Sequence, residues 1–173
     1  MSIVDAVGIC RLGGFVGSNP EIIGSVPSLG QYYNESEQQE FLRKSLPNGV
    51  QPGSFTLDRL KDSLILSHVF KIKSSKEGVR DDLASITVVI SEKKVNVGHF
   101  QELFKAIMNS FKGEIETLTP TLLMQTIERI YNGVNKNKKI KLDKVVIDIP
   151  KIVQEKKLTL VKGDITKLKG AFF

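Results

Sequence analysis

Few of the side chains that usually do chemistry occur in this chain of 173 residues. It has one cysteine, Cys10, and two histidines, His68 and His99. Cys10 and His68 both follow strand-like apolar patterns, where a free thiol is typically buried and inert and a single histidine is typically half-exposed. A nucleophile needs a base and a third group that orients the base, and a metal ion needs several ligands. No such set is spaced nearby, so we predict a non-enzyme with no catalytic, metal or cofactor site.

Two other patterns resemble ligand-binding motifs but are better explained by local structure. The glycine-rich stretch 13–20 lacks the Lys-Ser/Thr pair that opens a helix in a phosphate-binding loop. It predicts a turn that Pro20 completes. The neighbouring acids Asp81 and Asp82 suit a divalent cation, but no further acidic ligand is spaced nearby. We therefore expect these two acids to form a solvated entry into a strand.

The composition is that of an ordinary soluble domain, with 40% hydrophobic and 25% charged residues. No apolar run reaches the roughly 18–20 residues that a membrane-spanning helix needs. The first ten residues lack the basic start and long apolar core of a signal peptide. A single cysteine also excludes an internal disulfide framework. We predict a cytoplasmic protein, and peripheral contact with membranes stays open.

The net charge of +6 is concentrated towards the C-terminal end. Residues 136–173 contain eleven lysines and only four acidic residues, so we divide the chain into a domain, 1–135, and a lysine-rich extension, 136–173. β-branched runs at 145–149 and 158–161 predict strands in this extension, which could pair with the sheet, a partner or a second copy. The lysines either solvate an ordinary β-extension or contact anionic lipid or nucleic acid. Nucleic acid is disfavoured because this extension has no arginine, tyrosine or tryptophan.

The centre of the predicted domain is a strand, a turn and a helix within 81–111. Residues 84–90 are rich in β-branched types and almost uncharged, as in a buried strand. A helix capped by Asn96 should follow, because apolar residues then recur at three- and four-residue spacing. These residues are Phe100, Leu103, Phe104, Ile107, Met108 and Phe111. Such a stripe needs a broad apolar surface, which the sheet containing 84–90 supplies.

The other elements follow from similar patterns and from turn residues. Residues 3–12 and 21–26 predict a β-hairpin. Asn34 or Ser36 begins a helix that runs to residue 46, and Thr119-Pro120 begins another that Asn132-Gly133 ends. The pattern at 63–73 predicts one strand or a pair of strands, and 54–60 fits either a short strand or a turn of helix.

This order of elements resembles the longin domain, a relative of the profilin and roadblock folds. The local likeness is to the longin half of DENN-type and folliculin-type proteins, which open with a strand, a Gly-Pro turn, an Ile-Ile pair and a short strand ending in proline. The matching residues here are Gly17, Pro20, Ile22, Ile23 and Pro27, with two residues between the glycine and the first proline. The resemblance covers roughly 1–135. It implies an α+β fold in which a five-stranded antiparallel sheet carries one helix on one face and two on the other, with the basic β-type extension added.

The resemblance also implies a platform for small GTPases, other longin or roadblock domains, or helical peptides. We predict an adaptor or regulator of small GTPases in membrane-associated traffic or signalling. The alternatives are binding of anionic membrane or nucleic acid through the lysine-rich extension, and a homodimer formed by exchange of that extension. Association is expected at the hairpin edge 3–26, the strand 63–73 or the central helix. The candidate interface residues are Lys71, Lys73, Lys93, Lys94, Lys138, Lys139, Lys156 and Lys157.

Overall fold

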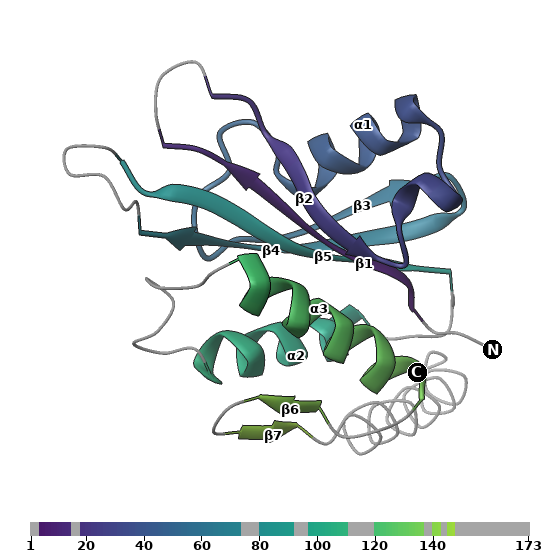
Figure 1. The fold of residues 1–173 in the computed structure, drawn as a ribbon, viewed down its shortest axis with the longest axis vertical. Helices are drawn as coiled ribbons and strands as arrows, with labels where there is room; N and C mark the ends of the chain where they lie inside the picture. Colours follow the sequence, from purple (N-terminus) through teal and green to yellow (C-terminus); the bar gives the residue numbers. More distant parts are fainter. Residues whose placement is uncertain are drawn as a thin grey trace, which may run out of the picture.

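The computed structural model describes residues 4–14, 18–73, 80–91, 97–110, 120–136, 140–142 and 145–147. Its main body is a five-stranded antiparallel sheet in the order β2-β1-β5-β4-β3. The strands are β1 (Val4–Leu12), β2 (Glu21–Val26), β3 (Phe55–Leu60), β4 (Ser63–Ile72) and β5 (Asp82–Ile90). Helix α1 (Glu35–Ser45) lies on one face of the sheet, and α2 (Val97–Ser110) and α3 (Pro120–Asn135) lie on the other (Figure 1). The predicted α+β fold with five antiparallel strands and three helices is confirmed.

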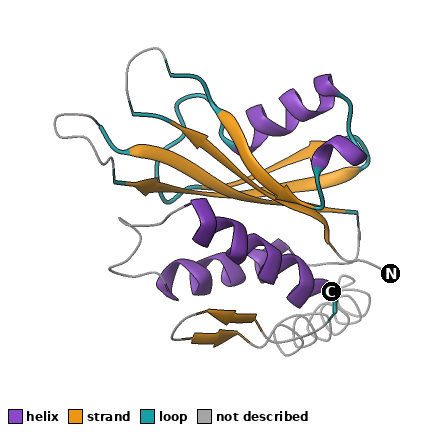
Figure 2. Cartoon of the chain, in the orientation of Figure 1, coloured by secondary structure: helices purple, strands orange, loops and turns teal. Residues whose placement is uncertain are grey.

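A short 3-10 helix, η1 (Leu29–Gln31), connects β2 to α1. Two further strands, β6 (Ile140–Leu142) and β7 (Val145–Ile147), form a separate sheet on the far side of α2 and α3 (Figure 2). They pair with each other, so this part of the lysine-rich extension does not lengthen the main sheet. The strand predicted at 158–161 lies outside the described residues. Within the described part of the chain, no helix is both long and apolar enough to cross a membrane.

Most of the local predictions on the N-terminal side are confirmed. The hairpin consists of β1 and β2, and α1 begins after Asn34. The Asn34 side chain accepts a hydrogen bond from the Glu37 backbone N–H at 2.8 Å, and Glu37 accepts one from the Asn34 backbone N–H at 3.0 Å. These reciprocal bonds form a capping box. The two ambiguous segments become β3 and the single continuous strand β4.

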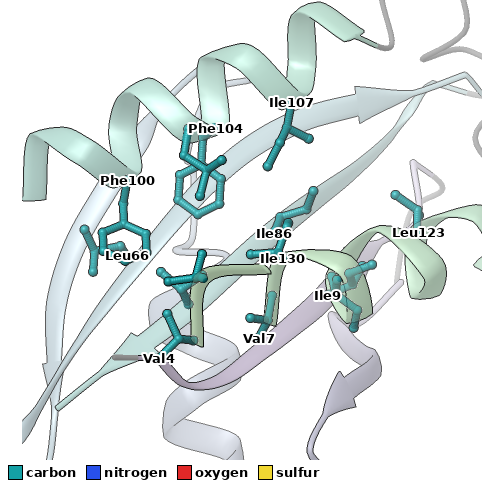
Figure 3. Packing of buried hydrophobic residues seen from close by; sticks show 14 of the residues in the cluster. Val4, Val7, Ile9, Leu66, Ile86, Phe100, Phe104, Ile107, Leu123 and Ile130 are labelled. Atoms are coloured by element: carbon teal, nitrogen blue, oxygen red, sulfur yellow. The ribbon is translucent and has the colours of Figure 1, made fainter. Parts of the chain in front are cut away.

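The apolar stripe of α2 packs against the sheet as predicted (Figure 3). Phe100, Phe104 and Ile107 are almost completely buried, in one cluster with Leu66 of β4 and Ile86 of β5. The strand 84–90 supplies part of this surface, because it alternates side chains between the two faces of the sheet. The predicted cap, Asn96, and the last residue of the predicted stripe, Phe111, lie outside the described residues.

Helix α3 begins at Pro120 as expected but does not end at Asn132-Gly133. It continues to Asn135, and Gly133 is buried within it. The Asn135 side-chain amide accepts a hydrogen bond from the Val4 N–H at 2.8 Å and donates one to the Val4 carbonyl at 2.9 Å. Glycine inside a helix costs about 1 kcal/mol relative to alanine. Packing and this double hydrogen bond explain why the helix passes the glycine.

The opposite face of the sheet forms a second core under α1. Phe41 and Leu42 of α1 are buried against Cys10, Ile65 and neighbouring side chains. The ring of Phe41 lies directly over Gly8, where a Cβ atom would come within 2.8 Å of the Phe41 Cζ. Glycine at this position therefore allows α1 to approach the central strands closely.

Candidate interaction surface

The sheet separates Cys10 and His68, the two side chains that could most readily act as nucleophile and base. Cys10 lies in the core under α1, whereas the His68 ring stacks on Phe104 on the opposite face, with ring centroids 6.1 Å apart. Burial raises the pKa of the Cys10 thiol to about 12, which keeps it protonated. The predicted burial of Cys10 is confirmed, and Cys10 and His68 do not form a nucleophile–base pair. Across the described residues, no three metal-ligating side chains come together.

His68 is half-buried between Phe104 and its cross-strand partner Phe55. Desolvation lowers the pKa of His68 below its usual value of 6.5. As the pH falls through 6.5, the unfolded chain therefore takes up a proton at this residue before the folded chain does, and stability decreases. We expect His68→Phe to reduce the loss of unfolding free energy between pH 7.5 and 5.5. Urea denaturation of both proteins across this range measures the effect, and identical pH profiles would contradict it.

The two neighbouring acids differ sharply in their surroundings. Asp81 is exposed, but Asp82 is only 7% exposed. Its Oδ2 accepts a hydrogen bond from the Arg11 Nε at 2.8 Å, and its Oδ1 accepts one from the Gly14 backbone N–H at 2.9 Å. A Cβ at Gly14 would lie 1.9 Å from the Arg80 carbonyl oxygen, so the two chain segments are in close contact. The prediction of a solvated strand entry is wrong for Asp82, because Arg11 becomes its neighbour only when β1 pairs with β5.

Only two of the eight candidate interface lysines can be placed. Lys71 and Lys73 are exposed at the end of β4, close to Asp82, which pairs with Ile72. The other six lie outside the described residues: Lys93, Lys94, Lys138, Lys139, Lys156 and Lys157. The strand 63–73, another predicted place of association, is β4 and lies between β5 and β3, so it is an interior strand of the main sheet. Strands β2 and β3 are the two edges of the main sheet.

Charged side chains link α1 to the edge strand β3. Lys44 of α1 forms ion pairs with Glu40 at 2.8 Å and with Asp58 of β3 at 3.7 Å. The Lys44 ammonium also donates a hydrogen bond to the Arg59 backbone carbonyl. The hydrogen bond to Glu40 is the main cause of a raised pKa at Lys44. Lys44 therefore stays charged at neutral pH and fastens the C-terminal part of α1 to β3.

A second contact fastens the N-terminal part of α1 to the turn between β3 and β4. Lys61 of this turn forms an ion pair with Glu37 and lies 5.8 Å from the centroid of the Tyr33 ring. Its φ of 54° is in the left-handed region, which non-glycine residues seldom adopt. The space between α1 and β3 is thus crossed by polar contacts at both of its ends. A helical peptide would have to break them in order to lie there.

The described residues include two strongly exposed large hydrophobic side chains. Tyr32, after η1, is 64% exposed, and Leu57, in the middle of β3, is 54% exposed. Phe55 lies on the same face as Leu57 and packs against Phe104, with ring centroids 5.9 Å apart. Leu57 was not among the predicted interface residues, although the two-residue spacing of Phe55 and Leu57 is typical of a strand with one apolar face.

Neither protein-family models nor curated proteins match this chain. Its own geometry nevertheless defines one surface that combines apolar and polar binding groups. We call the outward side of Phe55–Arg59 the β3 edge. It combines an exposed leucine with the backbone groups of a terminal strand, which is the combination that extended peptides recognise.

Proposed function

We propose that this chain is a non-catalytic interaction module of the longin type that acts as an adaptor or regulator of small GTPases in membrane-associated traffic or signalling. The observation that supports this most is the layered architecture of five antiparallel strands with α1 on one face and α2 and α3 on the other. The longin resemblance implies this same arrangement. Longin-like domains serve as binding platforms, so the shared layers favour a platform role here.

The placement of the reactive side chains also favours binding over catalysis. Cys10 is buried and protonated, and the sheet separates it from His68. Covalent catalysis needs an activated nucleophile with a base in hydrogen-bond reach. The exposed groups instead include Leu57 and Tyr32, which are types that contribute apolar area to protein interfaces.

Binding of the full chain to a panel of small GTPases tests this proposal. Each GTPase is loaded with GDP or with a non-hydrolysable GTP analogue, and binding is measured by biolayer interferometry. We expect at least one GTPase to bind in a nucleotide-dependent way. The same binding should persist when Lys138, Lys139, Lys156 and Lys157 are replaced by glutamine. No binding to any member of the panel would contradict the proposal.

The concentration of lysines in 136–173 supports a second candidate, the binding of anionic membranes. Each basic residue near an anionic surface contributes about 1 kcal/mol, and salt screens this attraction. Under this candidate the full chain binds vesicles containing phosphatidylserine, and the four-glutamine variant does not. Flotation of both proteins at low and high salt distinguishes this activity from GTPase binding.

A further inference from the structure

The backbone of β3 has a defined outward side. The Ser54 carbonyl accepts a hydrogen bond from the Val69 N–H of β4 at 2.9 Å, so this carbonyl points into the sheet. Successive residues of an antiparallel strand direct their N–H and C=O groups alternately to the two sides. The polar backbone groups of Phe55, Leu57 and Arg59 therefore point away from β4, at the open side of the sheet.

At one of these three residues, Arg59, side chains of the protein itself form hydrogen bonds with the outward backbone groups. The Arg59 N–H donates to the Asp58 Oδ1 at 2.7 Å, and the Arg59 carbonyl accepts from the Lys44 ammonium. Charged side chains that occupy an edge in this way prevent uncontrolled strand pairing. The corresponding groups of Leu57 have no hydrogen-bond partner among the residues that the structure describes. Strand addition is thus confined to the short open part around Leu57.

The side chains of the β3 edge add a chemical preference. Phe55, Leu57 and Arg59 occupy alternate positions, so their side chains share the face on which α2 lies. Leu57 is 54% exposed, and the exposed Arg59 guanidinium forms no ion pair within the described parts of the chain. Asp58, on the other face, already pairs with Lys44. The cross-strand side-chain contacts are most favourable when an added strand places an apolar residue opposite Leu57 and a carboxylate opposite Arg59.

The other edge of the sheet is less suitable for strand addition. The pairing of β2 with β1 is interrupted by a bulge between Ile22 and Gly24, and Pro27 follows the strand directly. Bulges and prolines both disfavour the pairing of an edge with another chain. The site where a Cβ of Gly24 would lie is also occupied by Met124 of α3.

A second copy of this chain fits the β3 edge less well than a different partner does. Antiparallel pairing of two β3 strands centred on Leu57 brings Phe55 of the second copy opposite Arg59. Centring on Asp58 instead brings two like charges together, which is destabilising. Neither register supplies the missing carboxylate.

From these observations we propose that the β3 edge binds an extended segment of a partner protein as a sixth, antiparallel strand. The segment carries a carboxylate opposite Arg59, followed at two-residue intervals by apolar residues opposite Leu57 and Phe55. This inference rests on the proposed role as an interaction module and specifies the chemistry of one partner. The backbone hydrogen bonds supply affinity, and the alternating side chains supply specificity.

A designed peptide tests the site directly in the full chain labelled with ¹⁵N. The probe is an acetylated and amidated peptide with the sequence Thr-Glu-Thr-Val-Thr-Val-Thr, and its control has lysine in place of glutamate. We expect shifts of backbone amide resonances to centre on residues 55–59. The lysine peptide should bind about two- to fivefold more weakly, which is the ratio that a cross-strand charge pair produces. The variant Arg59→Glu should reverse this preference, since only the sign of one exposed charge changes.

Three results would overturn the inference. The first is an absence of shifts at 55–59 at millimolar peptide, and the second is an equal response to both peptides in the native and Arg59→Glu proteins. The third is a doubling of mass in sedimentation that Leu57→Lys abolishes, because a second copy then occupies the edge. Binding to the GTPase panel is measured in parallel for the native protein and for Arg59→Glu. GTPase binding without peptide binding removes only this inference, whereas peptide binding without GTPase binding removes only the proposed GTPase role.

Discussion

Replacing Phe104 with alanine is expected to lower the free energy of unfolding by about 3–5 kcal/mol, as for other fully buried phenylalanines. Phe104 is 1% exposed and joins α2 to two strands through its ring contacts with Phe55 and His68. Removing the ring leaves a cavity between α2 and the strands β3 and β4. Domains of this size are typically stable by about 5–15 kcal/mol, so the variant should be close to unfolding at 37 °C.

Urea denaturation followed by circular dichroism measures this change. Lys105→Ala is the matched control, because Lys105 is the next residue of α2 and is exposed. Its effect should stay within about 0.5 kcal/mol. A loss below about 1.5 kcal/mol for Phe104→Ala would show that α2 is not held to the sheet by this ring.

Replacing Asp82 with alanine is the second large effect that we expect, at about 2–3 kcal/mol. The substitution leaves the Arg11 guanidinium and the Gly14 N–H without their shared carboxylate. The Gly14 N–H then loses its acceptor in a region where the segments of Gly14 and Arg80 touch. The Arg11 side chain is 35% exposed and can turn towards water, which keeps the cost below that of a fully buried pair.

A double-mutant cycle with Arg11→Ala separates the ion pair from the loop contact. If the ion pair carries part of the effect, the double variant should be less destabilised than the sum of the two single variants. Asp82→Asn should cost less than Asp82→Ala, because the amide oxygen can still accept from the Gly14 N–H. Additive single effects would show that Arg11 and Asp82 do not stabilise each other.

Sequence patterns predicted the elements whose signals are local. The capping box of Asn34 and Glu37 lies within four residues, and the α2 stripe repeats at helical spacing, so both were recognisable. The features that depend on distant partners were not. The burial of Asp82 depends on Arg11, and the extension of α3 beyond Gly133 depends on the contact between Asn135 and Val4.

The candidate site, the β3 edge, likewise depends on distant partners and could not be predicted from the sequence. Residues 55–60 combine apolar, acidic and basic types, so their pattern did not decide between strand and helix. The order in which the five strands pair makes β3 an edge strand and β4 an interior strand. The open backbone groups of Leu57 are a property of this order and cannot be read from residue types.

The interior position of β1, between β2 and β5, has a consequence for synthesis of the chain. On the ribosome, β1 emerges long before its partner β5, since Val4 pairs with Ile90. Translation proceeds at about 5–20 residues per second, so the interval lasts seconds. During that time β1 has only β2 as a neighbour, and an isolated hairpin is marginally stable in water. The apolar side chains of Val7 and Ile9 are then open to chaperones, and the contact between Val4 and Asn135 forms only after α3 has left the exit tunnel.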